Sequence, residues 1–285
     1  MLKKIKLITD SASDIELSLA KEKDIEILPI YVTMDGVTYK DRYELTNEEF
    51  YAKLASCKEL PKTSQIPVAD HYDAFKKYCD EYSIIYCCIS ASASGTAQSA
   101  NMAKEMILEE NPDADITIVK CNTFSHCYGL WVLNAAELIK EGKTKDEIVE
   151  YIETNSANTT FVMSVDDLTY LEKGGRIKAS AKVIANVLDI KPILTLEDGL
   201  IASKDKVRGS KKVAKKLLDI LINEAKEDYE QTITIYHINC PEKAEFLKNL
   251  LYENSPYKNA VIVSVGPTIG VHAGPGTIAY GYLKK

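Results

Sequence analysis

The chain has 285 residues, enough for two modest α/β domains or one large domain with a sizeable core. Its 42 acidic and 35 basic residues leave a formal net charge of -7, which argues against nucleic acid or an anionic membrane surface as the main partner. The longest apolar runs have the length of a strand, so we expect no integral membrane segment. The first residues lack the apolar core of a signal peptide, so we interpret them as the start of a first strand.

Apolar runs alternate with amphipathic stretches along the whole chain, as in strands that are followed by covering helices. The first half predicts, in chain order, strand 5–9, helix 14–23, strand 25–34, helices 46–57 and 68–82, strand 83–89, helix 95–111, strand 115–121, and helices 125–140 and 144–155. The second half predicts strand 159–165, helices 167–173 and 179–188, a hairpin at 191–207, helix 211–226, strand 232–238, helix 241–254 and strand 260–265. This alternation predicts two α/β domains, residues 1–157 and 158–285, with mainly parallel sheets and a ligand tunnel near the domain interface.

Local signals support some of these boundaries. Capping boxes at 46–49 and 144–147 predict two helix starts. The Glu197-Asp198-Gly199 turn predicts that the residues on either side of it pair as a hairpin.

Four polar segments lie where ligands gather in open α/β sheets, namely residues 9–14, 62–67, 90–96 and 266–276. The third offers hydroxyls and free N–H groups at a helix N-terminus, which suits an anion, although a serine cap on an ordinary helix is the simpler explanation of the segment taken alone. The fourth surrounds His272 with four glycines and two prolines. Such a loop is irregular and either allows a ligand to approach the backbone or serves as a structural turn.

Three further sites have two interpretations each. Thr63 and Ser64 either meet a ligand or cap the helix that follows. Asp10 and Ser11 either have a function or order the first strand-to-helix loop, and the second interpretation is the simpler one. Arg176 either has a function or lies in a solvated basic turn behind a helix stop.

Several common functional motifs are absent from the sequence. The seven cysteines form no C-x-x-C pair and the four histidines no H-E-x-x-H pattern, so we expect reduced thiols, a cytoplasmic protein and no metal site. There is also no phosphate loop, no dinucleotide-binding glycine motif and no nucleophile elbow. Nucleotide binding and serine hydrolysis therefore lack their usual sequence support.

A set of short motifs matches a known family in order along the chain. They are Thr9-Asp10-Ser11, Leu28-Pro29-Ile30, Tyr39-Lys40-Asp41, Thr63-Ser64-Gln65, Ser94-Gly95-Thr96, Leu171–Ile177, Ile190–Leu194 and Gly270–Gly276. On these residues the chain resembles the DegV family, whose FakB-type members are the fatty-acid-binding subunits of bacterial fatty acid kinase.

The resemblance implies two α/β domains with a long-chain fatty acid between them and its tail in a buried apolar tunnel. It implies that Thr63, Ser94 and His272 hydrogen-bond the carboxylate. A separate ATP-binding kinase subunit then phosphorylates that carboxylate for phospholipid synthesis. The chain itself is accordingly expected to bind lipid without being an enzyme and without a cofactor.

The same resemblance implies roles for residues around this site. Arg176 and Arg208 fall at positions associated with kinase docking or with the transfer step. The supporting loop residues are Asp10, Ser11, Ser64, Gly95, Thr96, Gly270 and Gly274.

The chain departs from the family pattern near the expected tunnel. Lys120 and Cys121 stand where Asp-Ser is usual, Cys127 replaces the first glycine of a G-x-G run, and Ala93 replaces a leucine. These differences predict a change in tunnel shape and in the preferred acyl chain, and they bear on the choice of partner.

Two other functions fit the same residues. Asp10, Ser94 and His272 are residue types that form a catalytic triad, which would make the chain an acyl or phosphoryl transfer enzyme. Alternatively, the chain is a lipid carrier or sensor that works without a kinase.

Overall fold

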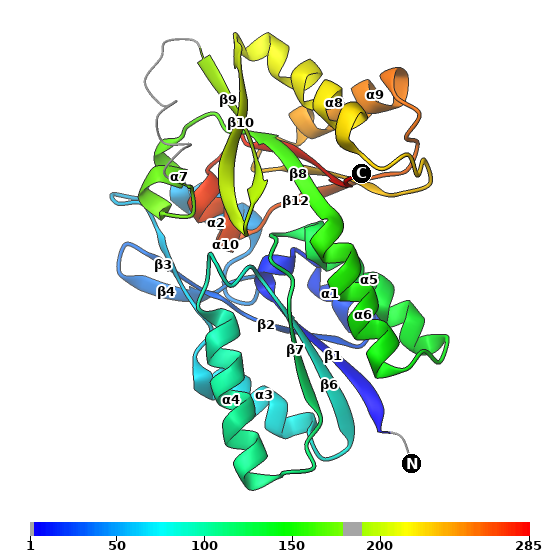
Figure 1. Cartoon of the computed structure of the whole chain (residues 1–285). Helices are drawn as coiled ribbons and strands as arrows, with labels where there is room; N and C mark the ends of the chain where they lie inside the picture. Colours follow the sequence, from blue (N-terminus) through cyan, green and yellow to red (C-terminus); the bar gives the residue numbers. More distant parts are fainter. Residues whose placement is uncertain (1–2, 179–189) are drawn as a thin grey trace.

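The computed structural model describes residues 3–178 and 190–285, whose strands form three sheets (Figure 1). The predicted helix 179–188 lies outside the described residues. The α/β class expected from the alternating pattern is confirmed.

The first half of the chain contains a four-stranded sheet. Its strands are β1 (Lys4–Asp10), β2 (Ile25–Leu28), β6 (Tyr82–Cys88) and β7 (Ile116–Lys120), all parallel and in the order β2-β1-β6-β7. The helices of this half are α1 (Leu17–Glu22), α2 (Asn47–Leu54), α3 (Val68–Tyr78), α4 (Thr96–Glu110), α5 (His126–Lys140) and α6 (Lys145–Asn158). Figure 1 shows α3 and α4 on one face of this sheet and α5 and α6 on the other, which explains why its strands are largely buried.

The second half forms a six-stranded sheet. Its strands are β8 (Thr159–Ser164), β9 (Ile190–Glu197), β10 (Leu200–Arg208), β11 (Ile233–His237), β12 (Ala260–Ser264) and β13 (Ile278–Leu283), in the order β10-β9-β8-β13-β11-β12. Of its pairs, β11–β12 is parallel and the others are antiparallel, so the prediction of mainly parallel sheets holds for the four-stranded sheet and is wrong here. The reason is that β9 and β10 form a hairpin and the last strand, β13, inserts between β8 and β11.

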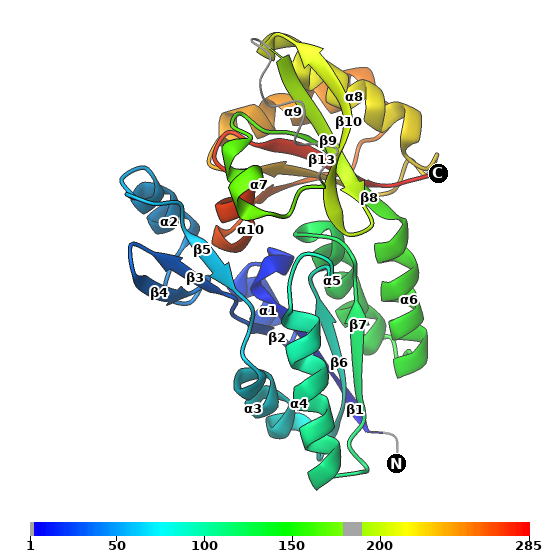
Figure 2. The same cartoon turned by 60° about the vertical axis from the view of Figure 1, so that its left-hand side comes forward.

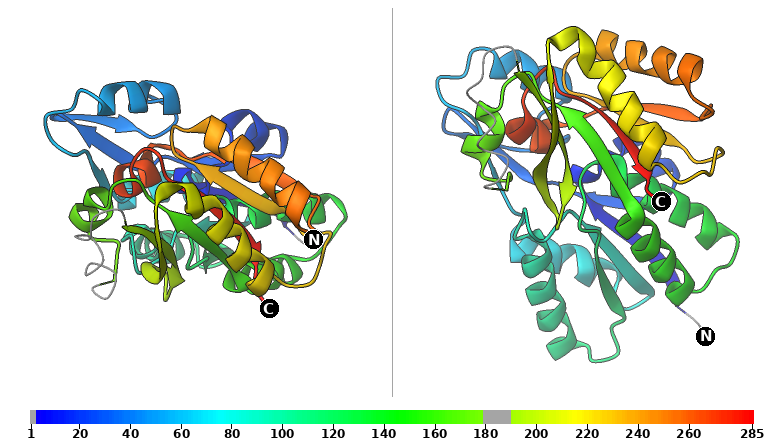
Figure 3. Two further views of the ribbon diagram at one scale, coloured as in Figure 1. Left: turned by 90° about the horizontal axis from the view of Figure 1, so that it is seen from above. Right: turned by 45° about the horizontal axis from the view of Figure 1, so that its top comes forward.

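The two faces of the six-stranded sheet pack against different partners. Helices α8 (Val213–Glu224) and α9 (Pro241–Asn254) cover the outer face, where Figure 3 shows them side by side. On β8, Val162 belongs to the core beneath these helices, whereas Phe161 and Met163 belong to the core shared with the first half. Because side chains alternate along a strand, one face of β8 is free to line a site between the halves.

A third, small sheet extends from the first half. It contains β3 (Tyr31–Met34), β4 (Val37–Lys40) and β5 (Lys62–Ser64), in the antiparallel order β4-β3-β5. The predicted strand 25–34 is therefore wrong, since it is two strands in different sheets. The break falls beside Pro29, which has no N–H to donate to a sheet and stops the ladder there.

Two elements near the C-terminus, the helix α10 and the strand β13, were not predicted. Residues of the glycine-rich segment form a short helix, α10 (Pro267–Ala273), where an irregular loop was expected. Pro267 occupies its first turn and Gly274 ends it at φ +75°, so the prolines and glycines cap a helix instead of preventing one. Figure 2 shows α10 and α7 (Thr169–Gly174) between the six-stranded sheet and the small sheet.

The local boundary signals were reliable. Both predicted capping boxes form, with the Thr46 and Thr144 hydroxyls accepting hydrogen bonds from the backbone of Glu49 and Glu147. The hairpin turn at 197–199 is also confirmed. A domain boundary between 157 and 158 stays a prediction, and it would fall in the last turn of α6.

A membrane-spanning helix and a metal-binding cluster are both absent from the described residues. Within residues 3–178 and 190–285, no helix combines the length and the apolar character needed to span a membrane. In the same residues, no cluster of histidine, cysteine or acidic side chains is placed to hold a metal ion. All seven cysteines are free thiols, and six of them are buried.

Candidate ligand-binding cavity

A cavity of about 360 Å³ lies between the two halves of the molecule. This volume is within the range of small-molecule sites, roughly 300–1,000 Å³. Both halves line it, and most of its wall is apolar. Among the apolar wall residues are Ile89, Phe124, Phe161, Met163, Leu171 and Ile201.

The position of the cavity follows from the parallel sheet. Ile30, Ile89 and Phe124 come after β2, β6 and β7 respectively, and all three line the cavity. The carboxyl ends of parallel strands meet at one edge of a sheet, where ligands of α/β proteins usually bind. Here the face of the six-stranded sheet that α8 and α9 do not cover closes over that edge.

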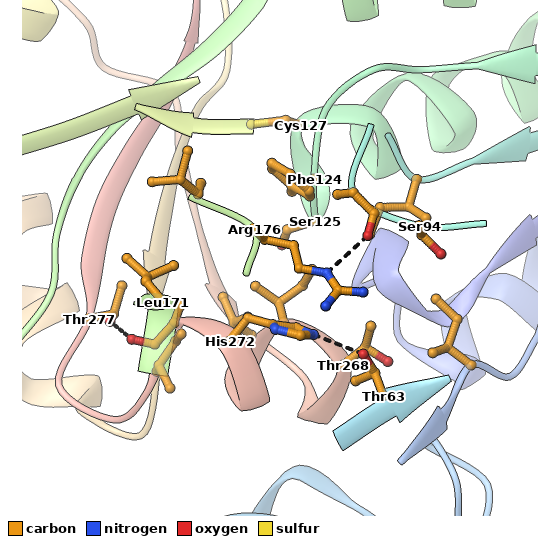
Figure 4. Close-up of a pocket in the computed structure, with 18 of the residues that line it drawn as sticks. Thr63, Ser94, Phe124, Ser125, Cys127, Leu171, Arg176, Thr268, His272 and Thr277 are labelled. Carbon is orange, nitrogen blue, oxygen red and sulfur yellow. Dashed lines mark hydrogen bonds between the residues drawn. The ribbon is translucent and has the colours of Figure 1, made fainter. Parts of the chain in front are cut away.

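Polar residues gather on one side of this apolar cavity. Thr63, Ser94 and His272, which were predicted as a group, all line it together with Arg176 (Figure 4). The Thr63 hydroxyl and His272 Nε2 lie 2.8 Å apart, although 209 residues separate them in the chain. The Ser94 hydroxyl lies 2.9 Å from the Thr96 hydroxyl at the start of α4.

The His272 imidazole is held in its neutral form. Burial lowers its pKa to about 4, and the nearby positive charge of Arg176 acts in the same direction. Its Nδ1 atom is buried and has no hydrogen-bond partner among the described residues. An unpaired buried polar atom of this kind costs about 1–3 kcal/mol.

Arg176 and Arg208, which were predicted to share a role, lie in different surroundings. Arg176 lines the cavity, where its Nε donates to the Ala93 carbonyl at 3.0 Å and its Nη1 to the Gly174 carbonyl at 2.6 Å. Arg208 is exposed at the end of β10 and is not one of the described cavity residues. The structure thus brings only Arg176 to the carboxylate-binding residues predicted from the sequence.

Gly174 and the predicted supporting residue Gly270 allow close packing around His272 and α10. A Cβ atom on Gly174 would lie 2.4 Å from His272 Nδ1, so the imidazole sits directly against the backbone of α7. A Cβ on Gly270 would lie 2.5 Å from the Tyr51 hydroxyl, so α10 packs equally tightly against α2.

Other supporting residues lie at the end of β5 and at the start of α4. Ser64 and Gly95 line the cavity, and Thr96 is fully buried. The Gln65 side chain, which the sequence analysis named in a family motif without a role, donates to Ser99 at 2.7 Å and lies over Gly95. These contacts fasten β5 to the N-terminus of α4.

Asp10 orders the first loop instead of acting in the cavity. Its carboxylate accepts hydrogen bonds from Ala12 N at 3.0 Å, from Ile89 N at 2.9 Å and from the Tyr128 hydroxyl at 2.6 Å. Since His272 pairs with Thr63, the residues proposed for a triad are engaged with different partners. The geometry therefore favours the structural interpretation of Asp10.

A buried acidic network, not foreseen from the sequence, fastens α10 to the first half. Asp41 accepts hydrogen bonds from the hydroxyls of Ser11 and Thr268, and Thr268 lines the cavity. Asp14 pairs with Arg42 at 2.6 Å and accepts from Gly266 N at 2.9 Å. Ser11, predicted as a supporting residue, thus acts through Asp41.

We expect Asp41→Asn to gain stability relative to the wild type as the pH rises. Burial raises the pKa of Asp41 from its usual 3.8 to about 6, so the folded protein binds a proton here that the unfolded chain has already lost between pH 4 and 6. This contribution is present at low pH and lost as the pH passes the folded-state pKa. One Asn oxygen can still accept from both hydroxyls.

Urea unfolding of both proteins at several pH values measures the effect. The difference in unfolding free energy should change by as much as about 3 kcal/mol between pH 4 and 7, in favour of the variant at pH 7. A difference that does not vary with pH would show that Asp41 titrates normally.

Some cavity residues could not be found from sequence signals. Phe161 and Met163 alternate on β8, a pattern that indicates one shared face but not what covers it. Thr277 and Ala279 also line the cavity, but they belong to or adjoin β13, which was not predicted. Cys127 was noted from the sequence only as a departure from the family pattern.

The fold and the cavity define an α/β protein with a largely apolar ligand site that has polar side chains on one side. Residues 4–285 match the model of the DegV family, described as uncharacterised proteins. A DegV domain-containing protein of Clostridium perfringens is 38% identical over 286 residues, which cover 99% of this chain and 98% of the relative. The chain belongs to the DegV family.

Solved structures of the family have the same fold. A fatty acid binding DegV family protein from Streptococcus agalactiae is 34% identical, with a TM-score of 0.87 and a match that covers 98% of each chain. A DegV family protein from Ruminococcus gnavus, solved with vaccenic acid, is 27% identical with a TM-score of 0.86, over 97% of this chain and 99% of that one. These relatives of the chain are thus fatty-acid-binding proteins.

Proposed function

We propose that this chain binds a long-chain fatty acid in the cavity and presents its carboxylate to a separate kinase subunit. The observation that carries the proposal is the division of the cavity into an apolar wall and one polar group, Thr63, Ser94, Arg176 and His272. An amphipathic ligand with a single polar end matches this division. The fatty acids bound by the related proteins are ligands of this kind.

The acyl chain supplies most of the affinity in this proposal. Each buried methylene contributes about 0.8 kcal/mol, so a long chain gives on the order of 10 kcal/mol before the costs of ordering. The polar group then needs to orient the carboxylate more than to retain it.

The carboxylate is held by neutral donors beside one positive charge. The Ser94 hydroxyl can donate to it. Thr63 and the neutral imidazole of His272, which has a single N–H, share a hydrogen bond, so one of these two groups can donate to the carboxylate while that bond is kept. Arg176 already donates to two backbone carbonyls, which keeps its charge near the carboxylate. A head group held in this way remains reactive, since it is not locked in a two-pronged arginine pair.

The kinase subunit supplies ATP, and a carboxylate oxygen of the bound lipid attacks the terminal phosphorus. The products are an acyl phosphate, which feeds phospholipid synthesis, and ADP. On this proposal the chain is a lipid-binding subunit and the nucleotide site belongs to the partner.

Two measurements test the proposal in sequence. Native mass spectrometry of the purified protein, followed by extraction of any released molecule, should detect one fatty acid per chain. No adduct, and no uptake after incubation with several fatty acids, would rule out lipid binding. The loaded protein is then mixed with the ATP-binding subunit of a bacterial fatty acid kinase. Lipid binding without acyl-phosphate formation would favour a carrier or sensor instead.

A further inference from the structure

The main cavity is separated from a second, much smaller one by two side chains. Cys127 and Tyr236 line both spaces. The smaller cavity has a volume of about 10 Å³, enough for about one water molecule, and Trp131 and Tyr282 also line it. The thiol and the ring therefore form a thin partition.

This partition joins the two halves of the molecule. Cys127 is near the start of α5 and Tyr236 is on β11, and the thiol sulfur lies 3.0 Å from the tyrosine hydroxyl. Both side chains are almost fully buried. A Cβ atom on Gly281 would lie 2.8 Å from the Tyr236 ring and 3.3 Å from the Cys127 sulfur, so the pair is packed tightly from behind.

The partition is electrically neutral and lies away from the polar group. Burial raises the pKa of Cys127 to about 11 and raises that of Tyr236 well above its usual value. In Figure 4, Phe124 lies between Cys127 and the polar residues His272 and Thr63. An uncharged wall at this end of the cavity suits the methyl end of an acyl chain.

We propose that Cys127 and Tyr236 form the end wall of the cavity and set the longest acyl chain that the protein accepts. This inference rests on the proposed binding of a fatty acid and adds which residues determine chain length. Until the tail meets the wall, each extra buried methylene should raise affinity about fourfold. Beyond that length the partition must move, and affinity should stop rising or fall.

The test is to measure dissociation constants for saturated fatty acids that differ by two carbons, using the whole chain. Cys127→Gly removes the thiol and connects the main cavity to the smaller one. We expect the best-bound chain to become longer by about two carbons. Cys127→Ala removes only the sulfur and should shift the preference in the same direction by less, which keeps the test open if the glycine variant does not fold.

Cys57→Ala is the matched control, because Cys57 is a free thiol that is not one of the cavity residues in the described chain. It should leave the order of affinities as in the wild type. An unchanged order in folded Cys127→Gly and Cys127→Ala, or an equal loss at every length, would overturn the end wall. If the wild type binds no fatty acid of any length, the proposed function itself fails.

Discussion

Replacing His272 by alanine should lower acyl-phosphate formation at saturating lipid by about a hundredfold or more, while fatty acid affinity falls about tenfold. The loss of affinity is moderate because one hydrogen bond disappears while the whole acyl chain stays buried. The larger loss in rate is expected because a fixed donor beside a reacting oxygen stabilises the charge that changes during transfer.

Two features of the site make His272 the critical position. Its imidazole is neutral, since burial and Arg176 lower its pKa to about 4, so it can donate one hydrogen bond and accept another. It is also fixed from two sides, by Thr63 at 2.8 Å and by the backbone of Gly174. An alanine retains neither the donor nor these contacts.

The effect is measured with the purified kinase subunit, by following acyl phosphate at several lipid concentrations and by an independent binding titration. His237→Ala is the control, because His237 is another buried histidine of the second half that is not among the described cavity residues. It should keep wild-type binding and transfer in the folded protein. Unchanged acyl-phosphate formation by His272→Ala would refute the assigned role.

Replacing Arg42 by alanine should destabilise the protein by about 3–5 kcal/mol at pH 7. The Arg42 side chain is 5% exposed and its partner Asp14 is 1% exposed, so the pair lies in the interior. Asp41 is buried next to it. Without the guanidinium, two buried carboxylates lose the positive charge that compensates them.

The pH dependence of this effect has a defined sign. In the wild type, Arg42 lowers the pKa of Asp14 and Asp41, opposing the rise that burial causes. Its removal should raise both pKa values further, so the folded variant takes up protons at a higher pH than the wild type. The destabilisation should therefore shrink as the pH falls below neutral.

Urea unfolding at pH 7 and at a lower pH measures both effects. Lys76→Ala serves as the control, because Lys76 and Glu110 form an exposed ion pair with side chains 44% and 47% accessible. Exposed pairs contribute about 0–1 kcal/mol, so this variant should remain close to the wild type. A loss of less than about 1 kcal/mol for Arg42→Ala would show that the buried acids do not need the cation.

The sequence by itself predicted the features that are formed by residues close to one another in the chain. The capping boxes at Thr46 and Thr144 and the hairpin turn at Gly199 were found because their hydrogen bonds join residues only a few positions apart. Alternating apolar runs predicted the α/β class for the same reason. The motif resemblance named Thr63 and His272 as members of one site.

Tertiary structure alone decided the arrangement of the second half. Strand β13 pairs antiparallel with β11, which is more than 40 residues away in the chain, and with β8, which is more than 100 residues away. Its position depends on these distant contacts. Helix α10 is only seven residues long and rich in glycine and proline, too short to show a periodic pattern. Its stability comes from contacts with α2 and α7.

The cavity shows the same division between local and long-range information. Its polar residues belong to motifs, but the contact between Asp41 and Thr268 spans 227 residues and that between Cys127 and Tyr236 spans 109. Periodicity and caps carry no information on which distant side chains meet. The sequence therefore determined the local elements and the candidate head-group residues. Packing of the two halves decided the shape, the polarity and the end wall of the cavity, because only folding brings the residues that line it together.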